Sequence, residues 1–309
     1  MGFDLLPYKD GYFQKLVDLL SLSFEMKAQD KQELIRWKLL NRIWGEPIIY
    51  TAFSEDRLIG VYTSIPHPIS YENETILATG CIDMVTHPDY RRQGIIKKLA
   101  EKTYQEVKNQ NYELSFGFSN EEGVKVDLNA NGYGYFVLGK FQKYYKLVVR
   151  KKSCSLSLKE TGDINVPAFI NPYLQIKKDK KYLDWRYITK PGVDCQLFEI
   201  QGDTTGLVVL KFEHNSCYVY DIVSDYSDQK NIFEIVRAIE NYCFDKHIHM
   251  VVYNCLKNKF WEKIFASFKF LKLPDVGKKY YFTVKVHNDQ NKNLYLNKNN
   301  WLLLSGDII

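Results

Sequence analysis

The sequence has 309 residues, of which 45% are hydrophobic, 26% charged and 15% aromatic. This composition is that of a globular protein and excludes a collagen-like or wholly disordered chain. The formal net charge of +5 fits an anionic small-molecule ligand, and it is too small by itself to indicate nucleic acid as a partner. The length predicts either one large domain or two of modest size.

Two features of the sequence bear on its location. Its apolar runs, such as Gly206–Leu210 and Trp301–Leu304, are far shorter than the roughly 20 residues of a membrane-spanning helix. The first ten residues place an acid and a proline where a secretory leader has a positive charge and an apolar stretch. Six cysteines are scattered without a C-x-x-C pair, mostly inside apolar runs. We therefore expect a protein of the reducing cytoplasm that does not insert into a membrane.

The first part of the chain predicts two helices followed by three strands. Apolar residues recur at helical spacing in the helices, and strand-like apolar runs follow them. The turns at Ser54–Arg57 and Tyr71–Glu74 separate the strands, so we expect an antiparallel meander. The expected elements are helices over 13–24 and 30–44 and strands over 48–54, 58–66 and 76–86.

Helices and strands then alternate to the end of the first half. A loop over 87–93 precedes a strongly amphipathic helix, with Leu99, Thr103 and Val107 on its apolar side. The expected elements are this helix over 94–110, a strand over 113–118, a helix over 121–131 and a strand over 135–150.

Residues 151–167 break this pattern. They combine charge, Ser, Gly and Pro with little periodicity, which predicts an interdomain linker. Beyond the linker a similar order returns, and it predicts a tandem duplication with domains at 1–150 and 151–309. The fold class expected is α/β (α+β), each domain being a mixed, mostly antiparallel sheet flanked by helices. The expected strands are 196–201, 206–213, 217–223, 249–254 and 279–286, and the helices are 229–246 and 259–268.

The stretch Cys81–Leu99, CIDMVTHPDYRRQGIIKKL, carries the clearest chemical signal. It runs from an apolar strand through a proline-containing turn into a helix that Arg91-Arg92-Gln93-Gly94 opens. The N-terminus of a helix exposes unpaired backbone N–H groups and carries partial positive charge, so it binds phosphate well. Gly94 lets a phosphate approach the backbone without meeting a Cβ. This pattern predicts a diphosphate site.

This stretch resembles the signature of the GCN5-related N-acetyltransferases (GNAT), in which Arg/Gln-x-x-Gly-x-Gly/Ala opens a helix after a strand and a turn. The match extends over the first half, including Asn131–Tyr133 after the next helix, and Ile96 stands where the family has its second small residue. The resemblance implies that the loop amides hold the pyrophosphate of acetyl-CoA and that the preceding strand end binds its pantetheine arm. The cofactor-binding residues implied are Met84, Val85, Thr86, Arg91, Arg92, Gln93, Gly94, Ile95, Ile96, Lys97, Ser119 and Asn120.

Acetyl transfer also needs residues that move protons. The tyrosine that many family members use as general acid aligns with Leu128, so Tyr133, Tyr135 or the substrate would have to protonate the leaving thiolate. For the base that deprotonates the acceptor we rank Asp83 and Glu121 first. The catalytic residues predicted are therefore Asp83, Glu121 and Tyr133.

Further assignments concern the carbonyl and the end of the chain. The backbone N–H of Val85 is our candidate to polarise the thioester carbonyl. The C-terminal carboxylate of Ile309 is another candidate base, because related tandem enzymes deliver their chain terminus to the active site. We interpret Cys81 as a core thiol, since direct transfer needs no acyl-cysteine.

The second half lacks the phosphate loop. Its equivalent turn, Ser224–Lys230, contains no glycine or arginine and has two aspartates that would repel phosphate. We expect one cofactor site per chain and a degenerate second GNAT-like domain. His247 and His249 lie at strand spacing without a Cys or carboxylate partner nearby in sequence, so we predict no metal site.

Together these observations predict an N-acetyltransferase that moves the acetyl group of acetyl-CoA directly to a primary amine. An amino sugar of surface-polysaccharide synthesis is one acceptor, because Tyr182–Tyr187 and Trp301–Asp307 look like segments of such two-domain enzymes. We expect a small-molecule partner, no nucleic acid, and a monomer or homodimer. The alternatives are an aminoacyl- or long-acyl transferase of the tandem type and a non-catalytic CoA-binding sensor or scaffold.

Overall fold

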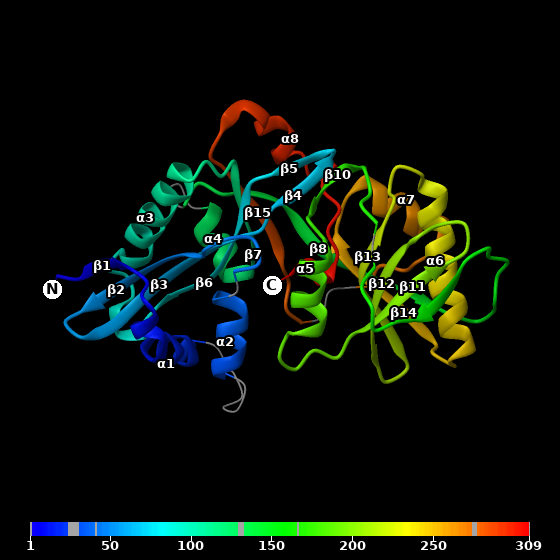
Figure 1. The fold of residues 1–309 in the computed structure, drawn as a ribbon, viewed down its shortest axis with the longest axis horizontal. Coiled ribbons are helices and arrows are strands. Elements are labelled where there is room, and N and C mark those ends of the chain that lie inside the picture. Colours follow the sequence, from blue (N-terminus) through cyan, green and yellow to red (C-terminus); the bar gives the residue numbers. More distant parts are fainter. Residues whose placement is uncertain are drawn as a thin grey trace.

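The computed structural model describes residues 2–23, 31–40, 42–128, 133–165, 167–273 and 277–308, and only the backbone of 126–128. Within this part of the chain, twelve strands form one long sheet and three form a smaller one. Figure 1 shows the long sheet passing through both halves of the molecule, with helices packed along it. None of the described helices is long and apolar enough to cross a lipid bilayer.

The helices and strands expected in the first half are confirmed, with small shifts at their ends. The helix α2 ends at Leu39, earlier than expected, and the chain bends over residues 43–45, where Gly45 has a φ of 137°. The elements are β1 Asp4–Pro7, α1 Phe13–Ser23, α2 Lys31–Leu39, β2 Ile48–Ser54, β3 Arg57–Pro66, β4 Ile69–Glu72, β5 Glu74–Ile76, β6 Ala78–Thr86, α3 Ile95–Asn109, β7 Leu114–Ser119, α4 Glu121–Leu128 and β8 Phe136–Leu147.

The expected elements of the second half are also present. They are accompanied by short pieces that the sequence did not indicate, among them a π-helical turn at Asp184–Ile188. The elements are β9 Ser157–Glu160, β10 Asn171–Ile176, α5 Lys180–Leu183, β11 Gln196–Gln201, β12 Gly206–Glu213, β13 Ser216–Ser224, α6 Gln229–Asp245, β14 Met250–Leu256, α7 Lys259–Phe268, β15 Tyr281–Val286 and α8 Lys292–Leu296.

Two of the expected loops contain more strand structure than the sequence indicated. The predicted linker contains β9, which pairs antiparallel with β11 at the edge of the long sheet. Its sequence, SLKE, is mostly polar, as is common for edge strands, and therefore resembles a linker. The predicted turn at Tyr71–Glu74 is present, but it forms the tip of a hairpin of two additional short strands, β4 and β5, and Glu72 in it has a φ of 50°. This hairpin pairs with β10 in the smaller sheet.

The strand order shows how the two halves interlock. It is β1-β2-β3-β6-β7-β15-β8-β14-β13-β12-β11-β9, and only the β6–β7 and β13–β14 pairs are parallel. The late strand β15 lies between β7 and β8, and β8 in turn pairs with β14 (Figure 1). The mixed, mostly antiparallel sheet is as expected. The domain boundary near residue 150 stays a prediction, since each half of the sequence contributes a strand to the other.

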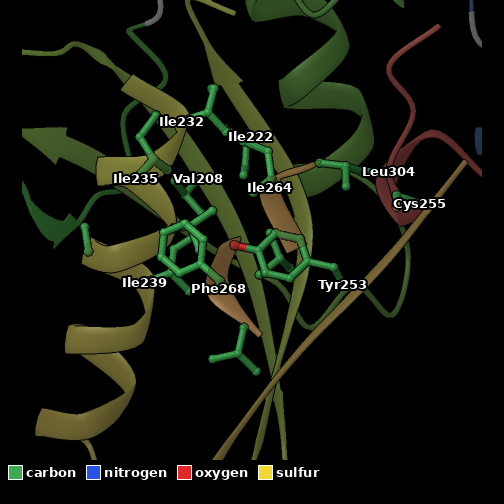
Figure 2. Close-up of a cluster of buried hydrophobic side chains, with 14 of the residues drawn as sticks. Val208, Ile222, Ile232, Ile235, Ile239, Tyr253, Cys255, Ile264, Phe268 and Leu304 are labelled. Carbon is green, nitrogen blue, oxygen red and sulfur yellow. The ribbon is translucent and has the colours of Figure 1, made fainter. Parts of the chain in front are cut away.

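The alternation of side chains along β2 and β3 divides the core of the first half into two layers. Ala52 and Tyr62 pack with α3 on one face, whereas Phe53 and Val61 pack with α1 and α2 on the other. In the second half, the aliphatic face of α6 covers the sheet. Figure 2 shows this cluster, with Leu304 from the end of the chain beside Cys255 of β14.

Candidate functional site

Strand β6 carries a bulge at the place where the sequence predicts the donor thioester. Val61 of β3 lies opposite Val85, whereas Thr63 lies opposite Ile82, so β6 has one residue more than β3 between these pairs. Asp83 lies within the bulge and adopts a left-handed conformation with a φ of 50°. An extra residue of this kind interrupts the ladder and re-aims the side chains beside it.

Beyond this point β6 and β7 diverge. They pair in parallel over Ala78–Cys81 and Leu114–Gly117, but β6 continues to Thr86 and β7 to Ser119. On the β7 side, the backbone of residues 82–86 therefore has no strand partner within the described part of the chain. Backbone N–H and C=O groups in this position can bind an extended ligand as a further strand would. Met84, Val85 and Thr86 all lie on this segment.

The N-terminus of α3 follows from the end of β6. Gly94 is its N-cap, with a φ of 73°, and no described side chain caps the helix. A Cβ built on Gly94 would meet no atom of the described chain within 4 Å, so the approach to the first helical amides is open. These amides lack intrahelical partners, and the helix dipole adds partial positive charge.

Cations surround this helix end. Arg91, Arg92 and Lys97 are exposed, as is Gln93, and the Nε of Arg91 donates to the carbonyl oxygen of Thr86 at 3.4 Å. Ile95 is buried and Ile96 is half-buried, packed against the core on the α3 face, so neither is as exposed as Gly94. Open amides and positive side chains are the groups that a diphosphate needs, and the residues present fit that group.

Ser119 and Asn120 lie across the divergence from β6. Ser119 ends β7 and is half-buried, and it pairs with Tyr281 of β15. The Oδ1 of Asn120 accepts a hydrogen bond from the backbone N–H of Gly123 at 2.8 Å, which caps α4. Asn120 thus has a structural role besides the cofactor contact that we predict for it.

Each of the two carboxylates that we predict as bases forms an ion pair with a different lysine. The ammonium of Lys38 in α2 lies 2.8 Å from Oδ1 of Asp83, and both side chains are largely buried. The ammonium of Lys279 lies 2.9 Å from Oε1 of Glu121, an exposed pair at the start of α4. Of these two carboxylates, that of Asp83 lies in the bulge of β6. Sequence reasoning missed Lys38, because nothing in the spacing of α2 indicates a contact with β6.

The tyrosines considered as proton donors lie near Cys81. The ring of Tyr133 packs edge-to-face on Tyr62 at 6.3 Å, and the backbone oxygen of Tyr133 accepts from Lys285 at 2.6 Å. The hydroxyl of Tyr135 donates to Sγ of Cys81 at 2.8 Å, and burial raises the pKa of both groups. A buried thiol with a raised pKa is a poor nucleophile, as our interpretation of Cys81 as a core residue requires.

Some predicted positions lie outside the described residues. These are the side chain of Leu128, the segment Asn131–Gly132 and the terminal Ile309. The neighbouring Ile308 is described, and its carbonyl oxygen accepts a hydrogen bond from Arg186.

The second half has a divergence of its own, and the chain fills it. β13 and β14 pair in parallel only over Ser216–Val219 and Met250–Tyr253. Beyond that point, the N–H of Leu256 donates to the carbonyl oxygen of Leu303 at 3.1 Å. The hydroxyl of Ser305 donates to the carbonyl oxygen of Val219 at 3.4 Å. The end of the chain thus occupies the position that corresponds to the predicted cofactor site of the first half.

Comparisons with known proteins agree with this geometry. A family model described as an acetyltransferase (GNAT) domain matches residues 5–129. No curated protein matches the chain by sequence. A probable N-acyltransferase from Enterococcus faecalis superposes with a TM-score of 0.66 at 10% identity, over 93% of this chain and 73% of that one.

Two other solved structures share the fold. A GCN5-related N-acetyltransferase from Anabaena variabilis gives a TM-score of 0.65 at 14% identity, over 93% of this chain and 73% of its own. A tandem GNAT protein from the clavulanic acid biosynthesis pathway gives a TM-score of 0.55 at 10% identity, over 92% of this chain and 98% of its own. The chain is therefore an acyltransferase with a GNAT acetyltransferase domain at residues 5–129, and as a whole it has the fold of tandem GNAT proteins.

Proposed function

We propose that this chain transfers an acetyl group from acetyl-CoA to the primary amine of a small acceptor, with an amino sugar as the first candidate. The observation that carries the proposal is the open N-terminus of α3 beside the diverging end of β6. Gly94 leaves the amides accessible, and Arg91 and Arg92 add charge that complements a diphosphate. In the second half the chain fills the corresponding position, which supports one cofactor site.

Residues of the first half would bind the donor, polarise its carbonyl group and deprotonate the acceptor. The backbone of Met84–Thr86 would bind the pantetheine arm, and the N–H of Val85 would donate to the thioester oxygen, on which negative charge develops. Asp83 would accept the proton of the acceptor ammonium, directly or through water. Acetyl-CoA supplies a thioester, whose C–S bond breaks as the new C–N bond forms.

The released thiolate needs a proton. Tyr133 remains our candidate donor, with Tyr135 as the alternative. Tyr135 already donates its hydroxyl proton to Cys81. Because the pKa of Tyr135 is raised by burial, this hydroxyl stays protonated at neutral pH.

We also propose that the protein works in the cytoplasm, as a monomer or homodimer. All six cysteines are free thiols, and such thiols persist in a reducing compartment.

Release of thiol from acyl-CoA in the presence of a panel of primary amines tests this proposal. Acetyl-, propionyl- and myristoyl-CoA are compared as donors, and we expect acetyl-CoA to give the highest kcat/KM. A preference for myristoyl-CoA would replace the proposal with a long-acyl transferase. Binding of acetyl-CoA without turnover of any amine would replace it with a CoA-binding sensor.

A further inference from the structure

Trp37 forms a fixed aromatic platform where α2 of the first half meets the second half. Its ring stacks on that of Trp185 at 4.6 Å with an interplanar angle of 13°. Each indole N–H donates to the backbone carbonyl of the other residue, at 2.8 and 3.1 Å. These reciprocal bonds fix both rings, so the platform is rigid.

Two cations from the second half lie over this platform. The guanidinium of Arg186 is 5.9 Å and the ammonium of Lys190 is 5.2 Å from the centre of the Trp37 ring. Arg186 is 4% exposed, whereas Lys190 is half-buried. A cation over an indole face is attracted by the negative charge of the ring, but the ring does not neutralise it.

Backbone carbonyl oxygens accept the hydrogen bonds of the Arg186 guanidinium. The Nε of Arg186 donates to the carbonyl oxygen of Gly306 at 2.8 Å, and Nη2 donates to that of Ile308. Its third nitrogen, Nη1, is buried and has no hydrogen-bond partner among the described residues. Among the residues that the structure describes, no carboxylate forms an ion pair with Arg186 or Lys190. A buried guanidinium nitrogen left unpaired is costly, and a bound anion would remove that cost.

The surroundings of Lys190 show the same excess of positive charge. Burial, and after it the charge of Arg186, lower the pKa of Lys190 to about 8. Cys195 opposes this shift, and the charges of Lys38 and Lys211 add smaller lowering effects. Lys38 and Lys211 each have a carboxylate partner, Asp83 and Glu213, but Lys190 has none in the described chain. An anion beside Lys190 would therefore be attracted by several cations at once.

This cluster is connected to the transfer site. Lys38 follows Trp37 directly in α2, and its ammonium lies 2.8 Å from Asp83 in the bulge of β6. The cluster therefore begins beside the residue that we propose as the base. An acceptor whose amine reaches Asp83 would extend its other end toward Lys190 and Arg186.

We propose that the acceptor is a small amine that carries an anionic group, a phosphate or a carboxylate, and that Lys190 and Arg186 bind this group. The inference rests on the proposed function, since it names the class of acceptor for the same site. It also has a chemical consequence for the amine. Positive charges near an ammonium favour its neutral form, which is the nucleophile, so the cluster both anchors the acceptor and eases its deprotonation.

Matched pairs of amines test the proposal, with thiol release from acetyl-CoA as the readout. Glucosamine 6-phosphate is compared with glucosamine, and phenylalanine with phenylalaninamide, so that each pair differs in one anionic group. We expect kcat/KM to favour one anionic member by roughly tenfold or more, the value of a charge-assisted hydrogen bond. The phosphate pair and the carboxylate pair then distinguish the two sources of the anion.

Variants of Lys190 test whether this cluster causes the preference for anionic amines. Lys190→Ala should abolish the preference, mainly through KM, and Lys190→Arg should restore most of it. Lys263→Ala serves as the control, because Lys263 is exposed on α7, where its ammonium donates to Oε1 of Gln229 at 2.7 Å. It removes the same charge and should leave the preference intact.

The outcomes separate this inference from the proposed function. Equal use of both members of each pair, or a preference that survives in Lys190→Ala, would overturn it. The inference would also be overturned if calorimetry showed binding of acetyl-CoA but no binding of either anionic amine, and if neither amine reacted. Failure of acetyl-CoA itself to bind would instead overturn the proposed function.

Discussion

His67 sits between β3 and β4 with its imidazole enclosed by aromatic rings. It is 1% exposed, and within the part of the chain that the structure describes neither ring nitrogen has a hydrogen-bond partner. The rings of Trp44 and Trp185 lie 5.1 and 5.5 Å away. Burial, and secondly the charge of Arg186, lower the pKa of His67 to about 3. This histidine is therefore an apolar ring of the core that becomes charged only when the chain unfolds.

Substitution of His67 by Phe should make the protein less sensitive to acid. A histidine in an unfolded chain has a pKa near 6.5, so between pH 6.5 and 3 the unfolded state binds one more proton than the folded state. The unfolding free energy of the wild type therefore falls with decreasing pH, by about 1.4 kcal/mol per pH unit from this residue alone.

Urea unfolding at pH 6.5, 5.5 and 4.5 measures this effect. As the pH falls, we expect the unfolding free energy of His67→Phe to decrease by about 1.4 kcal/mol per pH unit less than that of the wild type. Parallel pH profiles of the two proteins would show that His67 does not titrate on unfolding and would contradict its burial as a neutral ring.

At the scale of elements, the end of the chain acts as the missing partner of β14. Leu302–Leu304 are buried, and the turn that follows packs Gly306 against β13 and the π-helical turn. A Cβ on Gly306 would lie 2.0 Å from the hydroxyl oxygen of Tyr187 and 2.7 Å from the carbonyl oxygen of Tyr220. The packing leaves no space for even one methyl group.

We therefore expect Gly306→Ala to destabilise the protein by about 1–3 kcal/mol, the usual cost of overpacking. Gly162→Ala is the matched control. A Cβ there meets nothing within 4 Å, so its effect should stay within about 0.5 kcal/mol. Chemical denaturation of both variants gives the comparison. Equal stabilities would mean that the terminal segment is not packed between β13 and β14.

The sequence predicted local features of these elements better than their partners. Periodicity located α3, and the residues around Gly94 predicted a phosphate site at its start, because both signals depend on neighbours in the sequence. The bulge at Asp83 depends on the register between β3 and β6, and the contact with Lys38 depends on the packing of α2. Neither leaves a pattern in a single sequence. The edge strand β9 was missed because its composition is polar.

At the scale of the whole molecule, the two halves share their central strands. β7 and β8 both pair with β15, and β8 also pairs with β14. The smaller sheet joins β4 of the first half to β10 of the second. The repeat of element order was visible in the sequence, but the exchange of strands was not, since β15 has the same pattern whichever neighbours it takes.

This exchange predicts how fragments behave. A fragment of residues 1–150 would lack β15 and leave facing edges on β7 and β8, so we expect no cooperative unfolding transition from it alone. Coexpression with residues 151–309 should restore a folded complex with the circular dichroism of the intact chain. A fragment 1–150 that unfolds cooperatively by itself would show that the exchanged strand is dispensable.

The central claim is that the amides at the start of α3 bind the diphosphate of acetyl-CoA, and isothermal titration of three proteins with acetyl-CoA tests it most directly. Gly94→Glu places a carboxylate at this helix start, whereas Gly192→Glu makes the same change at another glycine with a similar φ and equally open surroundings. The strain of a side chain at positive φ, roughly 1–2 kcal/mol, is then common to both variants. We predict that the wild type and Gly192→Glu bind acetyl-CoA and that Gly94→Glu does not. Undiminished binding by Gly94→Glu would contradict the account.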